Sequence, residues 1–493
     1  MFFFMRTPIL TVYKKSACII TVVALLIAAG CGDRDLMEHA ANKEKSQRAS
    51  EQKIEQTLFS KILDSGKLKV ATVYSPVTYY IGPDGKRGYE FDLVNAFADA
   101  YGLEVEMVLK DSVKETISSV VIGEAHIAAA GISVNDDKVI GYRYGPVYQQ
   151  VRQEVICHRD RAQPNTIEQL ADLNFIVSYG SSYADTLRQI YATNQGIKWS
   201  EQHKSVEQLL EMVADKEIDC TVADSNIYET SRRYLPKLNA VLHLSKEQDL
   251  AWVLPENSNK LQEAISYWMN HFAEDGNLHH LEDKYYGHYK IFDYVNIRAF
   301  HRRVESRLPK YRELFKKAGN QFGIPWTTLA AQSYQESYWN PKAKSPTGVR
   351  GLMMLTLKTA RSMGYKSRID PENSIYGGAR YLAKLIGQVS PNVQGQDRLW
   401  FALAAYNVGM GHVHDAQTLA YKLGKDPNLW QDLREVLPLL SQKKYYKKTK
   451  YGYARGREPV RYVQRIREFK DILDRQGAAE IEAKLLQEVD VEL

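Results

Sequence analysis

The hydrophobic pattern of this chain changes its period once, close to residue 293, and this change constrains the fold more than any other feature. Before it, short β-rich runs alternate with helical segments, a pattern typical of α/β construction. After it, apolar residues recur at helical spacing over most of the remaining chain. The sequence therefore predicts two domains of different class, an α/β domain followed by a mostly α-helical one.

Composition and charge support this division. The chain has 493 residues, of which 44% are hydrophobic and 25% charged, and these values exclude a disordered chain, a coiled coil and a polytopic membrane protein. From His301 onward there are 33 Lys and Arg against 19 Asp and Glu, whereas residues 1–300 hold 32 against 40. Halves of opposite net charge indicate domains with different partners.

The N-terminal segment is typical of an export signal. Basic residues in the first 15 positions precede residues 17–30, which are apolar except for Thr21. As a helix, this apolar segment would be about 21 Å long, which is shorter than the ~30 Å hydrocarbon core of a membrane. We therefore interpret residues 1–30 as a signal peptide and not as a membrane-spanning helix.

The signal ends in Ala28-Ala29-Gly30-Cys31, which resembles a bacterial lipobox that would place a lipid on Cys31. Ala28 stands where such boxes usually have Leu, so a plain cleaved signal peptide is the alternative. Under either interpretation the protein works outside the cytoplasm. We expect it at the periplasmic face of the outer membrane, held by a lipid or by peripheral contact. Residues 31–60 are expected to form a polar tether.

The first large domain is expected to span residues 61–292. A helix is expected to open at residue 88, and strands are expected at 68–73, 103–108, 127–131 and 175–178. This order resembles the periplasmic solute-binding family for polar amino acids, over roughly residues 66–290. The resemblance implies a two-lobed clamshell with a ligand in the cleft between the lobes.

The same resemblance implies three ligand-binding residues. Lys138 occupies the position of the family's carboxylate-binding Arg, although a Lys supplies a point charge and not a bidentate fork. Asp224 matches the family's ammonium-binding Asp, and Ser181 precedes a helix whose N–H groups could hold a carboxylate. Each has a structural alternative, namely a surface ion pair, an N-cap or a turn.

The four cysteines exclude a disulfide framework, because two of them, Cys18 and Cys31, lie at the N-terminus. Cys157 and Cys220 remain. One bridge between them and two buried thiols are both compatible with the sequence. We expect no metal site, because the cysteines and histidines lack ligand spacing.

The second domain contains a candidate catalytic acid. A helix is expected to begin near Pro325 and to be closed by residues 340–341. Glu336 lies seven residues after the apolar Leu329, so the two side chains share nearly the same helix face. A carboxyl at the inner edge of a helix should have a raised pKa, which suits a general acid. The alternative is an exposed Glu at a helix end.

Three ordered motifs then change the interpretation of Glu336. Residues 335–337, 345–356 and 405–409 resemble the goose-lysozyme-like lytic transglycosylases, and residues 458–463 echo that family's last motif. With a solute-binding domain in front, the arrangement resembles the membrane-bound lytic murein transglycosylase F type. This resemblance implies a catalytic domain over residues 293–475, followed by a charged tail at 476–493.

The resemblance also implies roles for individual residues. Glu336 corresponds to the catalytic acid, and substrate contacts are implied for Ser345, Met354, Tyr406 and Asn407. Met354 stands where the common pattern has Gln, which puts in doubt the hydrogen bond that the Gln would make.

The number of carboxylates bears on the reaction. Ordinary glycosidases need two, and the candidates for a second are Asp370, Glu372 and Asp397, although Asp370 is better explained as a helix cap. Without a second carboxylate, the C6 hydroxyl of the sugar itself can attack while Glu336 switches from acid to base. The family resemblance implies this outcome, a lyase that leaves 1,6-anhydro-N-acetylmuramyl ends without a cofactor.

Two rival functions remain, a hydrolytic lysozyme-type muramidase and a ligand-binding protein with an inactive lysozyme-like domain. The expected partner is a peptidoglycan strand, with which the basic residues 443–448 could make contact. We also expect the first domain to respond to an amino acid or a muropeptide, the alternative being a degenerate clamshell kept for docking. Nucleic acid is not an expected partner of an exported chain.

Overall fold

A computed structural model describes residues 57–82, 85–135, 140–161, 163–287 and 293–491, with side chains as far as residue 477. The chain from Thr57 onward forms one compact unit. Cys31 and Lys138 lie outside the described residues, so the predictions made for them remain predictions.

The first half of this unit is α/β, as the sequence predicts, and its larger sheet forms one lobe. The strand order is β4-β1-β5-β12-β6, with β1 parallel to β4 and β5, and with β12 antiparallel to β5 and β6. Strand β12 comes from the far end of the domain, so a late segment of the chain completes the sheet of this lobe. Its strands are β1 (Lys67–Val73), β4 (Glu104–Lys110), β5 (Ile127–Ala128), β6 (Tyr142–Val151) and β12 (Gln248–Pro255).

The second lobe is built from the strands between β6 and β12. Three of them pair in the order β10-β7-β11, and two form a parallel pair, β8-β9. A separate hairpin, β2-β3, precedes the first long helix. The bounds are β2 (Tyr80–Gly82), β3 (Gly85–Arg87), β7 (Gln153–His158), β8 (Ile176–Ser178), β9 (Ser200–Gln202), β10 (Cys220–Asp224) and β11 (Leu238–His243).

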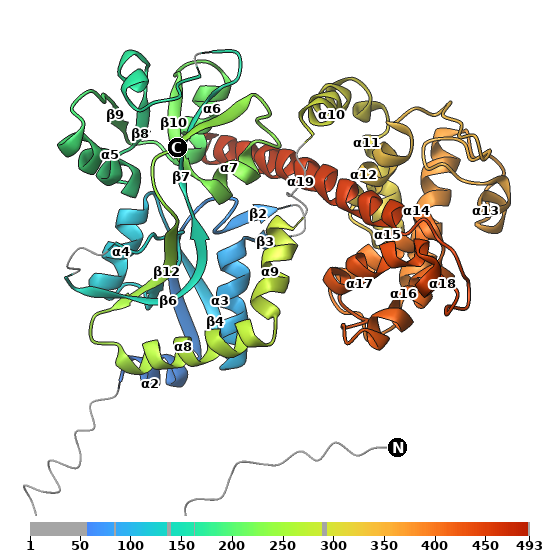
Figure 1. The fold of residues 1–493 in the computed structure, drawn as a ribbon, viewed down its shortest axis with the longest axis horizontal. Helices are drawn as coiled ribbons and strands as arrows, with labels where there is room; N and C mark the ends of the chain where they lie inside the picture. Colours follow the sequence, from blue (N-terminus) through green and yellow to red (C-terminus); the bar gives the residue numbers. More distant parts are fainter. Residues whose placement is uncertain (1–56, 83–84, 136–139, 162, 288–292, 492–493) are drawn as a thin grey trace, which may run out of the picture. The chain divides into compact units, whose positions relative to one another are not determined.

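Helices cover both sheets, and Figure 1 shows α3 and α9 side by side next to the larger sheet. Local signals explain where several helices begin; a capping box between Ser205 and Gln208, for example, opens α6. The helices are α2 (Leu58–Ser65), α3 (Tyr89–Ala100), α4 (Val113–Val121), α5 (Ser182–Thr193), α6 (Val206–Ala214), α7 (Ser225–Ser231), α8 (Asn259–Glu274) and α9 (Asn277–Tyr286).

Cys157 and Cys220 settle the alternative that the sequence left open. They are directly opposed on the antiparallel strands β7 and β10, both are fully buried, and they form a disulfide. The bridge therefore joins β7, the central strand of the three-stranded sheet, to its neighbour β10.

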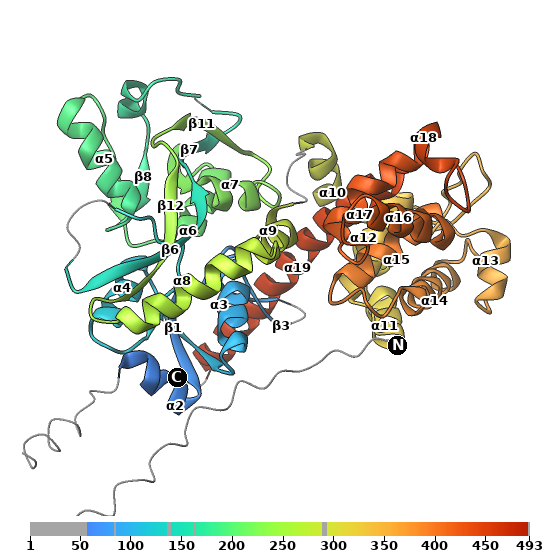
Figure 2. The ribbon, with the colours of Figure 1, turned by 60° about the horizontal axis from the view of Figure 1, so that its bottom comes forward.

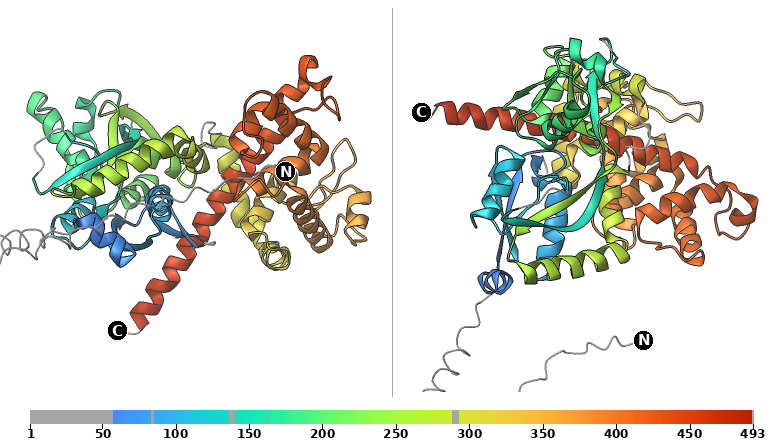
Figure 3. Two further views of the ribbon diagram at one scale, coloured as in Figure 1. Left: turned by 90° about the horizontal axis from the view of Figure 1, so that it is seen from below. Right: turned by 60° about the vertical axis from the view of Figure 1, so that its left-hand side comes forward.

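From residue 293 onward the described chain is dominated by helices, as predicted. The last of them, α19, continues past residue 475 without a break, which Figure 3 shows clearly. The helices are α10 (Tyr294–Ser306), α11 (Arg312–Phe322), α12 (Trp326–Ser337), α13 (Leu357–Ser362), α14 (Pro371–Gln388), α15 (Asp397–Val408), α16 (Met410–Lys422), α17 (Trp430–Val436), α18 (Lys443–Tyr446) and α19 (Arg457–Val491).

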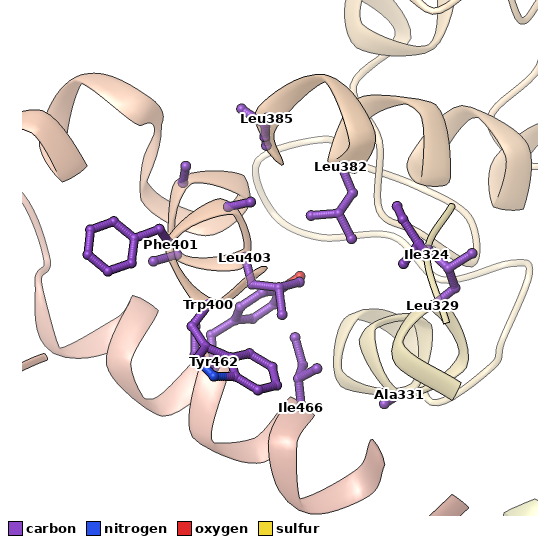
Figure 4. Close-up of a cluster of buried hydrophobic side chains, with 14 of the residues drawn as sticks. Ile324, Leu329, Ala331, Leu382, Leu385, Trp400, Phe401, Leu403, Tyr462 and Ile466 are labelled. Atoms are coloured by element: carbon purple, nitrogen blue, oxygen red, sulfur yellow. The ribbon is translucent and has the colours of Figure 1, made fainter. Parts of the chain in front are cut away.

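Helix α15 forms the centre of the helical domain. It packs against α14, α16 and α19, and Figures 1 and 2 both show it among these helices. Residues 401–405 are fully buried, as expected of a segment that is apolar all round. In Figure 4, Leu382 of α14, Leu403 of α15 and Ile466 of α19 point toward one another. This core fixes the ends of α12, α15 and α19 relative to one another.

Candidate active site

Glu336 is the penultimate residue of α12. Its Oε1 accepts a hydrogen bond of 2.5 Å from the hydroxyl of Tyr462. Burial raises the pKa of Glu336 to about 7, and the hydrogen bond from Tyr462 opposes this rise only in part. The structure thus confirms the raised pKa expected from the helix face, and Glu336 keeps a proton near neutral pH.

Tyr462 is held in place by a residue on the same helix as the acid. Gln332 lies one helical turn before Glu336, and its Nε2 donates to the Tyr462 hydroxyl at 3.2 Å. A phenol has a single proton to donate. Because Gln332 is the donor in its own bond with Tyr462, that proton is directed to Glu336.

The sequence singled out Tyr462 only as part of a motif, and it gave no role to Gln332. The two residues are 130 positions apart in the chain, so no local pattern joins them. A polar Gln332 on the buried face of α12 was the one available signal, since a fully buried amide needs a partner.

The loop that carries the second motif, residues 345–356, is held against α12 by hydrogen bonds. The hydroxyls of Ser333 and Ser337, four residues apart on one helix face, both donate to the carbonyl of Leu352, at 3.1 and 2.9 Å. The N–H of Met353 donates to Ser374 Oγ at 3.1 Å. Gly351 has φ +87°, and a Cβ there would lie 1.8 Å from the carbonyl oxygen of Arg368. Only glycine therefore fits this bend.

Tyr406 stands near the end of α15, where the third motif was expected to place it. Its hydroxyl donates to the carbonyl of Met353 at 2.9 Å, and its ring lies against Tyr381. Burial, followed by the nearby Glu336, raises the pKa of Tyr406 well above its ordinary value, so this phenol stays protonated. Helices α12, α15 and α19 thus converge on one acid, and the loop is held against them.

The other predicted substrate contacts lie on the loop that carries the second motif or next to Tyr406 in the chain. Ser345 opens a turn, where its Oγ pairs with Thr347 Oγ1 at 2.8 Å and accepts the N–H of Val349 at 3.3 Å. Met354 follows Met353 in a left-handed conformation with φ 45°, which is strained for a residue with a side chain. Asn407 is exposed beside Tyr406.

The end of α12 differs from the prediction. We expected residues 340–341 to close the helix, but it ends at Ser337, and Tyr338 and Trp339 both take φ 54°. The reason is packing: Trp339 turns back into the core, where its Nε1 donates to the carbonyl of Ala330 at 2.9 Å. Glu336 therefore lies at the true end of the helix.

The candidates for a second carboxylate serve helix ends. Asp370 caps α14 by accepting the N–H of Asn373, and Glu372 lies in the first turn of the same helix. Asp397 is buried and accepts the N–H of Trp430 at 2.8 Å. The chemistry of the site therefore centres on one protonated acid and two tyrosines.

In the first domain, the predicted ligand residues have different outcomes. Asp224 is buried at the end of β10; burial raises its pKa to about 7, and a hydrogen bond with Tyr183 lowers it in part. Ser181 is the N-cap of α5, so its hydroxyl accepts from the N–H of Ala184 and donates to the carbonyl of Ser178. The structural alternative therefore accounts for the hydroxyl of Ser181. Lys138 lies outside the described residues.

A second buried acid in this domain, Glu90, was missed. The Tyr148 hydroxyl donates to its Oε1, and the N–H of Gly131 donates to its Oε2 at 3.0 Å. Burial raises its pKa to about 7. The available signal was an acid among apolar residues in the first turn of α3.

Comparisons with known proteins agree with this organisation. Residues 67–288 match the family of bacterial extracellular solute-binding proteins, family 3, and residues 313–429 match the transglycosylase SLT domain. A membrane-bound lytic murein transglycosylase F from Maricaulis maris is 45% identical over 84% of this chain and 91% of its own length. One from Shewanella woodyi is 41% identical over 92% of this chain and 91% of its own length.

Among solved structures, a mutant of ArgBP from T. maritima covers 46% of this chain and 98% of its own, with 18% identity and a TM-score of 0.42. A substrate-binding protein from Streptococcus pneumoniae with bound histidine covers 46% of this chain and 96% of its own, with 16% identity and a TM-score of 0.42.

Proposed function

The chain belongs to the membrane-bound lytic murein transglycosylase F family, and on this premise we propose that Glu336 is the catalytic acid of its reaction. The protein is a lytic transglycosylase that acts on peptidoglycan. The observation that supports Glu336 is its raised pKa, about 7, combined with the hydrogen bond from Tyr462. A carboxyl that is protonated near neutral pH can donate to a leaving oxygen.

The proposed reaction has two proton transfers. Glu336 protonates the oxygen of the β-1,4 bond between N-acetylmuramic acid and N-acetylglucosamine, and the bond from that oxygen to C1 of the muramic acid breaks. The carboxylate of Glu336 then accepts the proton of the C6 hydroxyl, whose oxygen bonds to C1. No water is consumed, and the product is a 1,6-anhydro end. Tyr462 stabilises the carboxylate between the two transfers.

Substrate contacts are proposed for the residues that surround Glu336. The fixed position of Tyr406 supports this proposal, because its ring lies against Tyr381 and its hydroxyl donates to the carbonyl of Met353. Ser345, Met354 and the exposed Asn407 lie on the same loop or next to Tyr406. Each would contact a sugar or its N-acetyl group.

Replacing Glu336 tests the assignment directly. Glu336→Gln keeps the shape of the side chain but cannot transfer a proton, so release of anhydro-muropeptides from purified wall should fall about 10²–10⁴-fold. The matched control is Glu372→Gln, which changes an acid at the start of α14 and should leave the rate unchanged. Near-normal turnover by a folded Glu336→Gln protein would falsify the assignment.

We further propose that the chain is divided into the five segments expected from the sequence. The signal would span residues 1–30, the tether 31–60, the ligand-binding domain 61–292, the catalytic domain 293–475 and the tail 476–493. The match of the two family models to residues 67–288 and 313–429 supports the central boundary.

The solute-binding fold of the first domain points to a small-molecule ligand. We propose an amino acid or a muropeptide, with Asp224 facing the ammonium group and Lys138 the carboxylate. Titration of free amino acids and muropeptides against the full chain, followed by assays of wall cleavage with each binder, tests this. The proposal fails if nothing binds, or if a ligand binds and cleavage is unchanged.

Membrane attachment rests on the relatives, whose names describe them as membrane-bound. Among the described residues, no helix has the length and apolar character needed to cross a membrane. We propose that a lipid on Cys31 holds the protein at the periplasmic face of the outer membrane. The Cys31→Ser protein should then be released from membranes, and its retention after washing in high salt would favour peripheral attachment instead.

A further inference from the structure

A cavity of about 170 Å³ lies against α19 and is separate from both sites described above. Its walls come from the hairpin strand β3, from α9 and from α15 and α19. Neither Glu336 nor the buried acids Glu90 and Asp224 line it. A ligand in this cavity would therefore occupy neither the catalytic centre nor the position expected for an amino acid.

The wall of this cavity is strongly cationic. Among the described residues of the wall, two are acids, Asp92 and Asp471. Arg467 and Lys470 are buried, so their charges are poorly solvated. The wall contains six basic side chains, Lys86, Arg87, Lys284, Arg467, Lys470 and Arg475.

Two further acids lie behind the wall, and each contacts two cations. Asp474 accepts both Lys470 at 2.5 Å and Arg87 at 3.4 Å. Asp283 likewise pairs with Arg467 at 3.3 Å, but it also serves Arg434 at 2.5 Å. Counted over the described residues, the six basic side chains of the wall outnumber its two acids and these two acids behind it. Buried charge of one sign is costly, and an anion bound there would relieve the cost.

Ring contacts and ion pairs hold several of these cations in fixed positions. The guanidinium of Arg467 lies over the ring of Trp400 at 5.3 Å, and that of Arg475 lies over Tyr80 at 5.4 Å. Stacking of this kind holds the planar guanidinium of an arginine in a fixed orientation. The fork of Arg467 also donates to Oδ2 of Asp283 and to the carbonyls of Asp283 and Lys284, so its contribution to the cavity is a fixed positive charge. The amine of Lys284 adds a point charge, partly satisfied by Asp92 at 2.5 Å.

We propose that this cavity binds a small anion with two or more negatively charged oxygens. Since one water takes about 30 Å³ of liquid, the volume has room for a phosphate or a four-carbon dicarboxylate but not for a sugar chain. Either chemistry satisfies the cationic wall. The bound anion would hold α19, which carries Tyr462, against the first domain.

Calorimetric titration of the full chain tests the proposal with two probes, inorganic phosphate and succinate, against chloride at matched ionic strength. At least one probe should bind saturably and should raise the melting temperature as its concentration rises. Lys284→Gln removes a charge from the wall and should weaken that binding about tenfold, the effect of losing one charge-assisted hydrogen bond. Lys86 lies at an exposed position of the wall, and Lys86→Gln should also weaken binding of the probe. This variant leaves no buried acid without its partner.

The matched control is Lys260→Gln, a lysine that pairs with Glu263 on the surface of α8 and is not part of the cavity wall. Its affinity for the probe should equal that of the wild type. Binding of phosphate alone identifies a phosphate site, and binding of succinate alone a dicarboxylate site. The proposal is overturned if neither probe binds saturably, or if Lys284→Gln and Lys86→Gln bind as tightly as Lys260→Gln.

Discussion

The proposed catalytic centre around Glu336 and the region of the first domain around Asp224 contain the same arrangement, a buried acid hydrogen-bonded to a tyrosine. Glu336 pairs with Tyr462, and Asp224 pairs with Tyr183; in both cases burial raises the pKa of the carboxyl to about 7. They differ in what surrounds the acid. Around Glu336 several motifs from distant parts of the chain converge, whereas at Asp224 the neighbouring Ser181 is used to cap a helix. A raised pKa alone therefore does not distinguish the two acids, and the convergence of motifs on Glu336 is what favours it as the catalytic group.

The pH dependence of catalysis should sharpen this comparison most. Glu336 must be protonated to act first as an acid, so kcat/KM should fall as the pH rises through about 7, approaching tenfold per unit above that value. A rate profile of wall cleavage between pH 5 and 9 measures this. A profile that rises through pH 7 would instead require Glu336 to act from its ionised form.

Tyr462→Phe should have the next largest effect. The hydrogen bond from Tyr462 lowers the pKa of Glu336, so its loss should raise that pKa and move the fall in activity to higher pH. The rate should also drop about tenfold, because the carboxylate formed during the reaction loses its donor. Tyr406→Phe is the control for the pH shift, since the Tyr406 proton is directed to the carbonyl of Met353. An equal shift in both variants would contradict the account.

Gln332→Leu should have a smaller effect of the same kind. Without the amide of Gln332, the Tyr462 hydroxyl is free to rotate, and a neutral hydrogen bond of this type is worth about 0.5–1.5 kcal/mol. We expect a loss of activity of about two- to tenfold. In the Tyr462→Phe background the same substitution should cost little more, because the two residues act through one hydroxyl. Additive losses in the double variant would show that Gln332 acts independently of Tyr462.

Asp224→Asn should leave basal wall cleavage unchanged, in contrast to Glu336→Gln. Its effect should be on stability. Since folding raises the pKa of Asp224 from 3.8 to about 7, the folded state binds more protons than the unfolded state in that interval, and this group reduces stability as the pH rises through it. Asp224→Asn should therefore flatten the dependence of the melting temperature on pH between about 4 and 7. An unchanged slope would place Asp224 in solvent.

Several parts of the fold and site followed from the sequence because their signals are local. The change of period near residue 293 and the inward position of Glu336 depend on spacing along one element. The donor to Glu336 could not be predicted in this way, because Tyr462 lies 126 positions away and is brought to the acid only by packing of α12 against α19.

The first domain shows the other limit of prediction from sequence. Ser181 fits both a ligand contact and an N-cap, and only the structure shows that its hydroxyl caps α5. Glu90 was missed because its partners, Tyr148 and the N–H of Gly131, come from separate strands and loops. Resemblance to a family gave the fold of this domain but did not decide the use of each side chain.

The most direct test of the central claim is to digest purified peptidoglycan in water enriched in oxygen-18 and to analyse the new chain ends by mass spectrometry. Attack by the C6 hydroxyl uses no water, so the account predicts 1,6-anhydro ends without the heavy isotope, formed by the wild type and lost in Glu336→Gln. New reducing ends that carry oxygen-18 would show hydrolysis and would contradict it.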